Sequence, residues 1–369
     1  MSVLKILHTA DLHLDSPFEG LPKDKAVLRR QRQRGLLKRL AELAKSENVD
    51  IVLLAGDLLD SGSCYAETGE ELIKTLSDIP APVFISPGNH DFYSQYSLYS
   101  KLKFPENVHI FKNNRIECVN LPGSSARVWG AAFTDKYSSA LLEGFSATKT
   151  PDTLDIMCIH GEVARDSQYN PISEKSIADS GMDYIALGHI HKGSGLCRAG
   201  STYYAWPGCP EGRGFDECGD KSVYIVSLGD GKCSVKPVSV ASGKYMILPV
   251  ELGEAEPYDA ICAALPENTQ NDVYRVLLRG ETESAPELSM LTAKLSDRFF
   301  ALQLRDETTL HRDIWESVGE DSLKGQFLRR LRAVYDSAET DSERKTAVQA
   351  ARWGIAALDR REEVLRHDD

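Results

Sequence analysis

The sequence lacks the features that mark membrane-spanning and disulfide-rich proteins. It has no apolar run near the length of about 18 residues that a membrane-spanning helix needs, and its first apolar stretch is too short for a signal peptide. Its eight cysteines form no CxxC pair and no regular framework, which indicates free thiols in a reducing compartment. Internal repeats and low-complexity tracts are also missing. These absences predict a soluble, cytoplasmic protein.

Positive charge is scarce as well. The chain has 43 lysines and arginines against 55 aspartates and glutamates, so its formal net charge is -12. A field of this sign repels polyanions, and any role on nucleic acid therefore needs a local basic patch or bound metal. The 369 residues are 42% hydrophobic and 27% charged, an ordinary globular composition with room for about two or three domains.

Five short apolar runs each end in polar side chains, and they occupy residues 3–9, 50–55, 82–86, 154–159 and 183–187. Runs of this length predict buried strands, and residues 25–45 between the first two carry leucines at near-helical spacing. The alternation predicts an α/β fold. Open α/β sheets place their functional sites at the carboxyl ends of the strands, where these polar side chains stand.

The second half of the sequence predicts a further sheet and then two smaller parts. The strands of the further sheet are expected at residues 202–205, 222–228 and 234–240. Strand and helix patterns then alternate up to residue 305, and helical patterns follow. We therefore expect residues 1–243 to form the main domain, residues 244–309 a small α+β domain, and residues 310–369 a C-terminal helical segment.

Side chains that bind metals follow all five of the apolar runs, in the motifs DLH, GD, GNHD, HG and GHIH. The candidate metal ligands are Asp11, His13, Asp57, Asn89, His160, His189 and His191. Carboxylates and imidazoles without thiolates suit Mn²⁺, Fe²⁺ or a similar ion better than a structural zinc. A carboxylate shared by two ligand sets can bridge a metal pair about 3.5 to 4 Å apart, which is the arrangement for phosphoryl displacement. The motifs therefore indicate phosphoester hydrolysis with two divalent ions.

Each motif alone is weak evidence, because a lone DxH or HxH is more often a strand-end turn or a surface histidine. Five of them in register at strand ends have no packing explanation, so a catalytic centre is favoured. The series DxH…GD…GNHD…H…GHxH resembles the calcineurin-like metallophosphoesterase superfamily over about residues 1–240. The segments ADLHLD and GDLLD, with residues 206–217 (WPGCPEGRGFDE), resemble bacterial SbcD-type DNA repair exonucleases, most closely their YhaO-like branch.

This resemblance implies a two-sheet αββα sandwich with an appended α+β capping domain, and it assigns the ligands to two metals. One ion would be held by Asp11, His13, Asp57 and His191. The other would be held by Asp57, Asn89, His160 and His189, so that Asp57 is the bridge. Mn²⁺ is the expected metal, with Fe²⁺ and Mg²⁺ as alternatives. His90 is expected to protonate the leaving oxygen or stabilise the transition state, with Asp91 or Asp60 orienting its ring.

Lysines and arginines concentrate between residues 23 and 45, where nine of them stand against two acidic residues. We call residues 23–45 the basic helix. It is either a solvated helix face or a surface that contacts DNA phosphates. The candidate DNA contacts are Arg29, Arg30, Arg32 and Arg34. Because no aromatic residue is interleaved with these charges, such contact would be independent of DNA sequence.

The C-terminal helical segment carries an apolar stripe of Leu323, Phe327, Leu331, Val334 and Tyr335. A stripe of this kind either caps the chain's own sheet or docks a partner helix. In SbcD-type proteins such a segment binds the coiled-coil base of an SMC-like ATPase. The resemblance therefore implies a similar ATPase partner, and a homodimer of the nuclease is compatible with it.

The sequence thus predicts a metal-dependent phosphodiesterase that acts on DNA, as the exonuclease subunit of an SbcCD-like DNA repair complex. One alternative is a small-molecule phosphodiesterase or phosphatase, against which the extra α+β domain and the helical segment speak. The other alternative is a DNA-end binding or scaffolding subunit. Such a subunit would not need His90 together with a complete set of metal ligands.

Overall fold

The computed structural model describes residues 3–61, 64–121, 123–253, 255–282, 284–310 and 314–358. The chain divides into two compact units. The first unit consists of Met1–Leu248, Leu265–Val276 and Thr292–Gln303, and the second of Pro249–Ala264, Leu277–Leu291 and Leu304–Asp369. The division into three domains at residues 243 and 309 stays a prediction.

The first sheet has six strands in the order β12-β11-β1-β2-β3-β4. Its strands are β1 (Leu4–Thr9), β2 (Ile51–Leu54), β3 (Val83–Ile85), β4 (Val108–Ile110), β11 (Val223–Gly229) and β12 (Lys232–Val238). The strands β1, β2, β3 and β4 pair in parallel, and β11 pairs antiparallel with both β1 and β12. Because β1, β2 and β3 are parallel, the loops that follow them leave the sheet at one edge.

The second sheet also has six strands, in the order β5-β6-β7-β8-β10-β9. Its strands are β5 (Glu117–Asn120), β6 (Ala126–Gly130), β7 (Leu154–Ile159), β8 (Tyr184–Leu187), β9 (Cys197–Ala199) and β10 (Thr202–Ala205). The central strands β6, β7, β8 and β10 are parallel. The loops after β7 and β8, which carry the last three predicted histidine ligands, therefore also leave their sheet at one edge.

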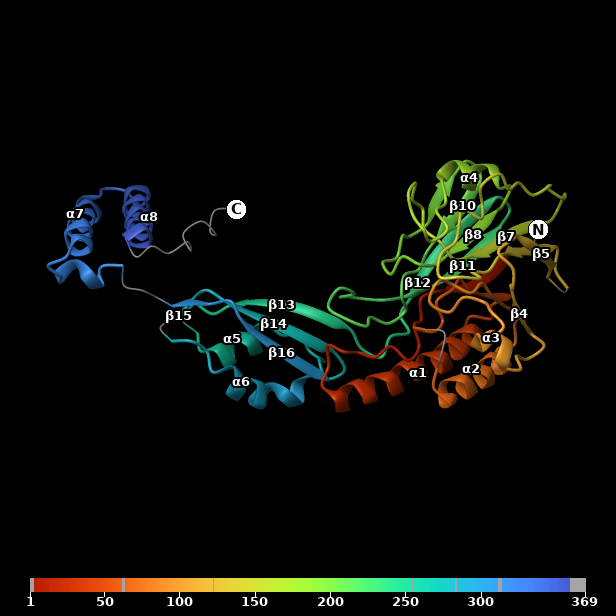
Figure 1. Ribbon diagram of the computed structural model, residues 1–369, viewed down its shortest axis with the longest axis horizontal. Helices are drawn as coiled ribbons and strands as arrows, with labels where there is room; N and C mark the ends of the chain where they lie inside the picture. Colours follow the sequence, from red (N-terminus) through yellow and green to blue (C-terminus); the bar gives the residue numbers. More distant parts are fainter. Residues whose placement is uncertain are drawn as a thin grey trace. The chain divides into compact units, whose positions relative to one another are not determined.

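Three hydrophobic cores hold these layers together. The two sheets pack face to face, so that Ile6 of β1 and Ile156 of β7 share one core. The next side chain of β1, Leu7, points to the opposite face of the sheet, as strand alternation requires. There it shares a second core with Leu36 of helix α1 (Lys23–Ser46), which covers this face. Outside the second sheet, Ile177 belongs to the third core. The covering helices are α1 (Lys23–Ser46), α2 (Ala66–Asp78) and α3 (Leu98–Lys101) on the first sheet and α4 (Glu174–Asp179) on the second (Figure 1). The predicted αββα sandwich is confirmed.

A smaller sheet follows in the chain, with the strand order β13-β14-β16. Its strands and the helices between them are β13 (Tyr245–Glu251), α5 (Pro257–Ala264), β14 (Val273–Arg279), α6 (Leu288–Leu295) and β16 (Ala301–Asp306). Two short strands, β15 (Glu281–Thr282) and β17 (Thr309–Leu310), form a separate parallel pair. The alternation of strand and helix agrees with the expected α+β pattern.

The C-terminal segment contains the helices α7 (Leu323–Ser337) and α8 (Asp341–Leu358), which pack on each other as a helical hairpin. Thr340 and Glu343 make the reciprocal hydrogen bonds of a capping box at the start of α8, at 3.1 and 3.2 Å. The ring of Phe327 in α7 packs directly on Gly354 of α8, where an added Cβ would lie 2.1 Å from the ring. One residue of the apolar stripe, Phe327, is therefore used inside the hairpin, and docking of a partner by the rest of the stripe stays a prediction. Residues 311–313 and 359–369 of the C-terminal segment lie outside the described residues.

Two further observations concern the cysteines and the helices. All eight cysteines lie within the described ranges, and each is a free thiol. Among the helices that the structure describes, none is long and apolar enough to cross a membrane.

Candidate metal centre

The loops that follow the parallel strands carry all seven candidate metal ligands. Two backbone hydrogen bonds join the loops after β1 and β2, from Asp11 N to Gly56 O and from His13 N to Asp57 O, both at 2.9 Å. The side chain of Gln33 in α1 donates to the His13 carbonyl at 2.9 Å, so the basic helix is fixed to the same loop. The backbone geometry of these loops is thus set by neighbouring strands and by α1.

Four of the candidate ligands have a left-handed backbone, with φ values of 54° at Asp11, 43° at His13, 51° at Asp57 and 83° at His189. This region costs a residue with a side chain about 1–3 kcal/mol. Such strain persists only where the surrounding structure enforces it, and it concentrates at functional sites. The strain here turns consecutive side chains out of the strand direction and toward one shared space.

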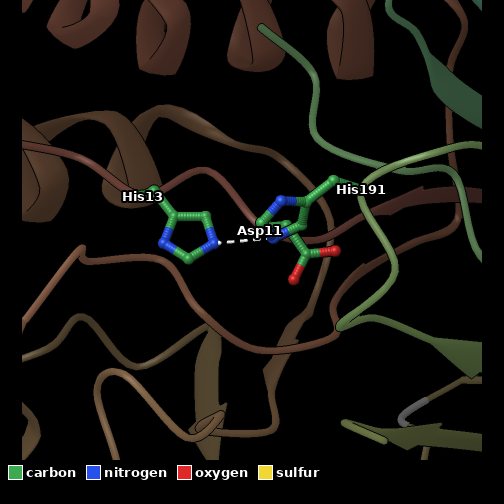
Figure 2. Close-up of side chains that lie close together, drawn as sticks. All are labelled: Asp11, His13 and His191. Carbon is green, nitrogen blue, oxygen red and sulfur yellow. Dashed lines mark hydrogen bonds between the residues drawn. The ribbon is translucent and has the colours of Figure 1, made fainter. Parts of the chain in front are cut away.

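Asp11, His13 and His191 form the first cluster, in which one ligand atom from each residue lies within 4.8 Å of the others. Figure 2 shows the two imidazoles beside the Asp11 carboxyl group. Their Nε2 atoms lie 3.1 Å apart. The other ring nitrogens face carboxylates: His13 Nδ1 lies 3.3 Å from Asp60, and His191 Nδ1 lies 2.7 Å from Glu217. Because carboxylates only accept hydrogen bonds, they favour the proton on each Nδ1, so that the two Nε2 lone pairs converge. The contact of His13 with Asp60 is one of charge, without a hydrogen bond, and Nη2 of Arg213 also lies 3.1 Å from Nδ1 of His191. Converging lone pairs are the donor arrangement that a cation requires.

Asp57, His160 and His189 form the second cluster, again with ligand atoms within 4.8 Å of one another. The Nδ1 of His160 faces the carbonyl oxygen of Ala55 at 2.8 Å, so this nitrogen carries the proton and Nε2 is the free donor atom. That Nε2 lies 3.4 Å from Asp57 Oδ2 and 3.0 Å from Asn89 Oδ1. Asn89 Oδ1 is also 3.1 Å from His189 Nδ1. Asn89 thus joins the second cluster.

Asp57 is a member of the second cluster and also lies next to the first. Its Oδ2 lies 3.8 Å from His13 Nε2 in the first cluster and 3.4 Å from His160 Nε2 in the second. Its other oxygen, Oδ1, accepts a hydrogen bond from the backbone N–H of His90 at 2.9 Å. This position between the clusters is the one expected of a bridging carboxylate.

The electrostatics of the centre also favour a cation. Burial, together with the nearby charge of Asp57, raises the pKa of Asp11 well above its ordinary value. Burial lowers the pKa of His13 to about 4, and burial followed by the charge of His160 lowers the pKa of His189 to about 4. The imidazoles of His13 and His189 are therefore neutral at neutral pH, and a divalent ion would balance the buried carboxylates. The donor set fits two divalent metal ions.

His90 lies at the open side of the centre. Its ring is exposed, its Nδ1 is 2.9 Å from the backbone carbonyl oxygen of Asp60, and its ring centroid is 4.8 Å from that of His13. One of its ring nitrogens also lies within 4.8 Å of ligand atoms of His13 and Asp57. The Nε2 of His90 is consequently the nitrogen available to a substrate.

Asp91 does not have the expected place beside the His90 ring. Its buried carboxylate accepts hydrogen bonds from the backbone N–H groups of Leu58 at 2.7 Å and Gly88 at 2.9 Å, and from the Tyr99 hydroxyl at 2.6 Å. Asp91 therefore ties the loops after β2 and β3 together. The structure corrects its assignment as a catalytic residue, and the Asp60 carbonyl takes the role of orienting His90.

Arg29 corrects part of the expected DNA contact surface. Its side chain is fully buried, pairs with Glu211 at 2.9 Å and donates to the carbonyl oxygens of Gly212 and Gly243, each at 3.2 Å. A guanidinium held in this way cannot reach a phosphate. The sequence pattern could not distinguish this internal ion pair from a surface charge, because its partner lies more than 180 residues away.

The other three candidate DNA contacts, Arg30, Arg32 and Arg34, are partly exposed. Arg30 donates to the Pro17 carbonyl at 3.0 Å, and the guanidinium of Arg32 lies 4.3 Å from the ring centroid of Phe300. Arg34 pairs with Glu67 at 2.7 Å, and the Glu67 side chain is 75% exposed. An exposed pair of this kind contributes little to stability, so a phosphate could replace the Glu67 carboxylate.

Several residues that support the centre escaped the sequence analysis. Arg213 and Glu217 lie in the segment 206–217, which the sequence marked only through its resemblance. Asp60 was considered only as an orienting group for His90, whereas its carboxylate faces His13. The signal that could have found the pair is the spacing of Arg213 and Glu217, four residues apart and shortly after the GHIH motif.

Replacing Gly88 by alanine should displace Asp57 and weaken the metal centre. A Cβ at this position would lie 2.2 Å from Asp57 Oδ1 and 2.7 Å from the Asp57 backbone nitrogen, closer than real contacts allow. We expect Mn²⁺ affinity to fall at least about tenfold, the lower end of the effect of disturbing a ligand's support. Calorimetric titration with Mn²⁺ measures this. Gly319→Ala is the matched control, since nothing lies within 4 Å of its added Cβ. Unchanged Mn²⁺ binding by a folded Gly88→Ala variant would contradict the expectation.

Comparison with known proteins adds independent information. A family profile described as calcineurin-like phosphoesterase matches residues 4–193. The metallophosphoesterase YhaO of Bacillus subtilis is 31% identical over 243 residues, which cover 63% of this chain and 59% of YhaO. The SbcD component of the nuclease SbcCD from the same organism is 26% identical over 288 residues, 66% of this chain and 71% of that protein. The DNA double-strand break repair protein Mre11 of Saccharolobus solfataricus is 24% identical over 244 residues, 61% of each chain. The matches with YhaO and Mre11 thus span less than two thirds of those proteins.

Proposed function

Since the chain belongs to the calcineurin-like phosphoesterase family, we propose that it is a two-metal phosphodiesterase that acts on DNA, as the exonuclease subunit of a DNA repair complex. The observation that carries this proposal is the pair of ligand clusters around Asp57, whose Oδ2 lies 3.8 Å from His13 and 3.4 Å from His160. Mn²⁺ is the metal that we propose for both positions, because the donors are oxygen and imidazole nitrogen.

Two divalent ions held in this way supply charge stabilisation for the attacking and leaving oxygens of an in-line displacement. The chain's own residues provide the rest. Asp11, His13 and His191 would hold the first metal ion. His160, His189 and Asn89 would hold the second. His90, anchored by Nδ1 on the Asp60 carbonyl, can donate a proton from Nε2 to the leaving oxygen when its ring is protonated.

A row of aromatic rings beside the second cluster favours a nucleic acid as substrate. The ring centroid of Tyr169 lies 4.9 Å from that of His189, and the ring of Tyr137 follows at 5.7 Å. Tyr137 is 50% exposed, and the ammonium group of Lys136 lies 5.6 Å from its ring centroid. An exposed ring with a neighbouring cation suits the stacking of an unpaired base. A small phosphomonoester would have no use for this row.

The relatives support the same substrate. One is named as part of a nuclease and one as a DNA double-strand break repair protein. From the names of these relatives and from the helical hairpin we propose a partner, an SMC-like coiled-coil ATPase that binds at α7 and α8. Leu323 and Val334 remain largely exposed on α7 and are the apolar side chains available for that contact. A homodimer and a cytoplasmic location stay predictions.

The partly exposed arginines of the basic helix should contribute to DNA binding. Arg30 and Arg34 lie one helical turn apart in α1, which Gln33 fixes to the loop of His13. In the variant with both changed to glutamine, the slope of log affinity against log salt should fall by up to about 1.8, because each phosphate contact contributes about 0.9. Fluorescence anisotropy with labelled duplex DNA at several salt concentrations measures the slope. Lys45→Gln, at the far end of the same helix, is the control. If the double variant keeps the original slope, the basic helix is a solvated face and DNA approaches elsewhere.

The decisive test of the proposed function uses the purified protein with Mn²⁺, and in parallel with Mg²⁺ or Fe²⁺. Its substrates are end-labelled single-stranded and duplex DNA, bis-p-nitrophenyl phosphate and p-nitrophenyl phosphate. We expect DNA to be shortened from an end and the diester to be hydrolysed faster than the monoester. Uncut DNA with rapid monoester hydrolysis would favour the small-molecule phosphatase. DNA that is bound but never cut would favour the scaffolding subunit.

A further inference from the structure

Arg213 stands between two carboxylates at the edge of the first cluster. Its Nη1 donates to Asp60 Oδ1 at 2.9 Å, and its Nη2 donates to Glu217 Oε1 at 2.7 Å. Each of these carboxylates faces one histidine of the cluster: Asp60 lies 3.3 Å from Nδ1 of His13, and Glu217 lies 2.7 Å from Nδ1 of His191. One guanidinium therefore joins the supports of two metal ligands.

The two carboxylates favour one nitrogen of each ring as the metal ligand. A carboxylate only accepts hydrogen bonds, so Glu217, 2.7 Å from Nδ1 of His191, favours the proton on that nitrogen and a lone pair on Nε2. Nη2 of Arg213 lies 3.1 Å from the same Nδ1. Asp60 lies 3.3 Å from Nδ1 of His13 in a charge contact without a hydrogen bond, and this contact favours the same tautomer. Those Nε2 atoms of His13 and His191 face each other at 3.1 Å. Partners of this kind fix both the protonated nitrogen and the ring orientation of a metal-binding histidine. The planar fork of an arginine can hold two carboxylates in fixed directions, whereas a lysine offers a point charge.

The same network reaches His90. Asp60 is held through its side chain by Arg213 and by the Ser16 hydroxyl, each at 2.9 Å. Its backbone carbonyl oxygen lies 2.9 Å from Nδ1 of His90. A shift of Asp60 would therefore move the supports of His13 and His90 together.

We propose that Arg213 is a positioning residue that orients His13 and His191 through Asp60 and Glu217, and thereby sets the metal affinity of the first cluster. This inference rests on the metal centre of the proposed function, and it does not depend on DNA being the substrate. It assigns a role to the segment 206–217 that the ligands alone do not reveal.

The chain contains a matched arginine for comparison. Arg39 donates to Glu211 Oε2 at 3.0 Å and to the Val240 carbonyl, so it is also an arginine that holds a buried carboxylate. The side chain of Arg39 is 30% exposed and that of Arg213 is 20% exposed. Glu211 is bound to Arg29 and Ser242 rather than to a histidine of the centre. Loss of either arginine breaks an ion pair, but only loss of Arg213 removes support from metal ligands.

The experiment is a calorimetric titration of the metal-free full chain with Mn²⁺, for the original protein and for Arg213→Ala, Arg213→Lys, Glu217→Gln and Arg39→Ala. We expect two Mn²⁺ per chain in the original protein and in Arg39→Ala. Arg213→Ala should keep one Mn²⁺ at nearly unchanged affinity and bind the other about 10- to 100-fold more weakly. Arg213→Lys and Glu217→Gln should give smaller losses for the same ion, because each retains part of the network.

Chemical rescue separates positioning from general destabilisation. Arg213 lines a cavity of about 410 Å³ together with Gly214, Phe215, Tyr245 and Arg275, which gives a small cation access to the position of the missing side chain. Millimolar methylguanidinium should restore most of the lost Mn²⁺ affinity in Arg213→Ala, whereas methylammonium at the same concentration should not. The melting temperatures of metal-free Arg213→Ala and Arg39→Ala, recorded without either salt, show whether the two variants lose similar stability.

Several outcomes would overturn the inference. One is two Mn²⁺ bound at the original affinity by Arg213→Ala. Another is an equal loss of Mn²⁺ affinity in Arg39→Ala, which would make the effect one of stability alone. If Arg213→Ala does not fold, unchanged Mn²⁺ affinity in both Arg213→Lys and Glu217→Gln would equally refute it. Because the measurement is metal binding, an original protein that binds two Mn²⁺ but leaves DNA intact would sink the proposed function while the role of Arg213 stands.

Discussion

Replacing Asp57 by asparagine should remove metal from both clusters and abolish phosphodiester hydrolysis. Asparagine has nearly the same shape and tolerates the left-handed backbone found at this position, φ 51°, so the fold should survive. The change removes the negative charge of the Asp57 carboxylate. Its Oδ2 lies 3.8 Å from Nε2 of His13 and 3.4 Å from Nε2 of His160. Metal affinity should fall by more than about 100-fold, because loss of a hydrogen-bond partner of a metal ligand can already lower it by that factor. Elemental analysis of bound metal and the rate on bis-p-nitrophenyl phosphate measure the two effects.

The matched control for this change is Asp220→Asn. The Asp220 side chain is 89% exposed and pairs with Lys244 at 2.9 Å, so the same loss of charge occurs on the surface. Both metal content and rate should stay at the original level in this variant. An Asp57→Asn protein that keeps two metals and hydrolyses the diester normally would show that Asp57 is not the bridge.

The strands and the grouping of the candidate ligands could be predicted because both depend on local patterns. An apolar run that ends in a polar motif is visible in the sequence, and parallel pairing brings the ends of such strands to one edge. His13 and His191 are 178 residues apart, yet each stands directly after a strand, and their Nε2 atoms meet at 3.1 Å. The fold and the clustering of the candidate ligands therefore follow from the same signal.

The residues around the ligands could not be predicted because their roles depend on distant partners. Arg29 has the sequence context of a surface charge, but Glu211 meets it in the interior. Arg213 reaches Asp60 across 153 residues of chain. Helical periodicity likewise identifies the apolar face of α7, but only the packing of Phe327 on Gly354 shows that α8 occupies part of it. A sequence pattern shows that a helix face is apolar, but it does not show which element or partner packs against that face.

Changing His90 to asparagine should separate metal binding from catalysis. The ring is exposed and its Nδ1 is anchored on the Asp60 carbonyl at 2.9 Å, so its removal should leave two metals in place. If Nε2 protonates the leaving oxygen, DNA cleavage should fall by about 10²- to 10⁴-fold, the usual contribution of a general acid. Hydrolysis of bis-p-nitrophenyl phosphate should fall much less, because nitrophenolate leaves readily without a proton. Rates on both substrates and the metal content of the same preparation are the measurements.

The dependence on the leaving group distinguishes this role from the other two that His90 could have. A residue that only stabilises charge in the transition state would slow both substrates by a similar factor, since the same charge develops on each. A residue that binds metal would show the loss directly in the elemental analysis, and the ring does lie within 4.8 Å of ligand atoms of His13 and Asp57. His109→Gln, a half-buried histidine of β4 outside both clusters, is the control and should alter neither rate. Equal losses on the two substrates with both metals retained would therefore reject proton donation and leave charge stabilisation as the function of His90.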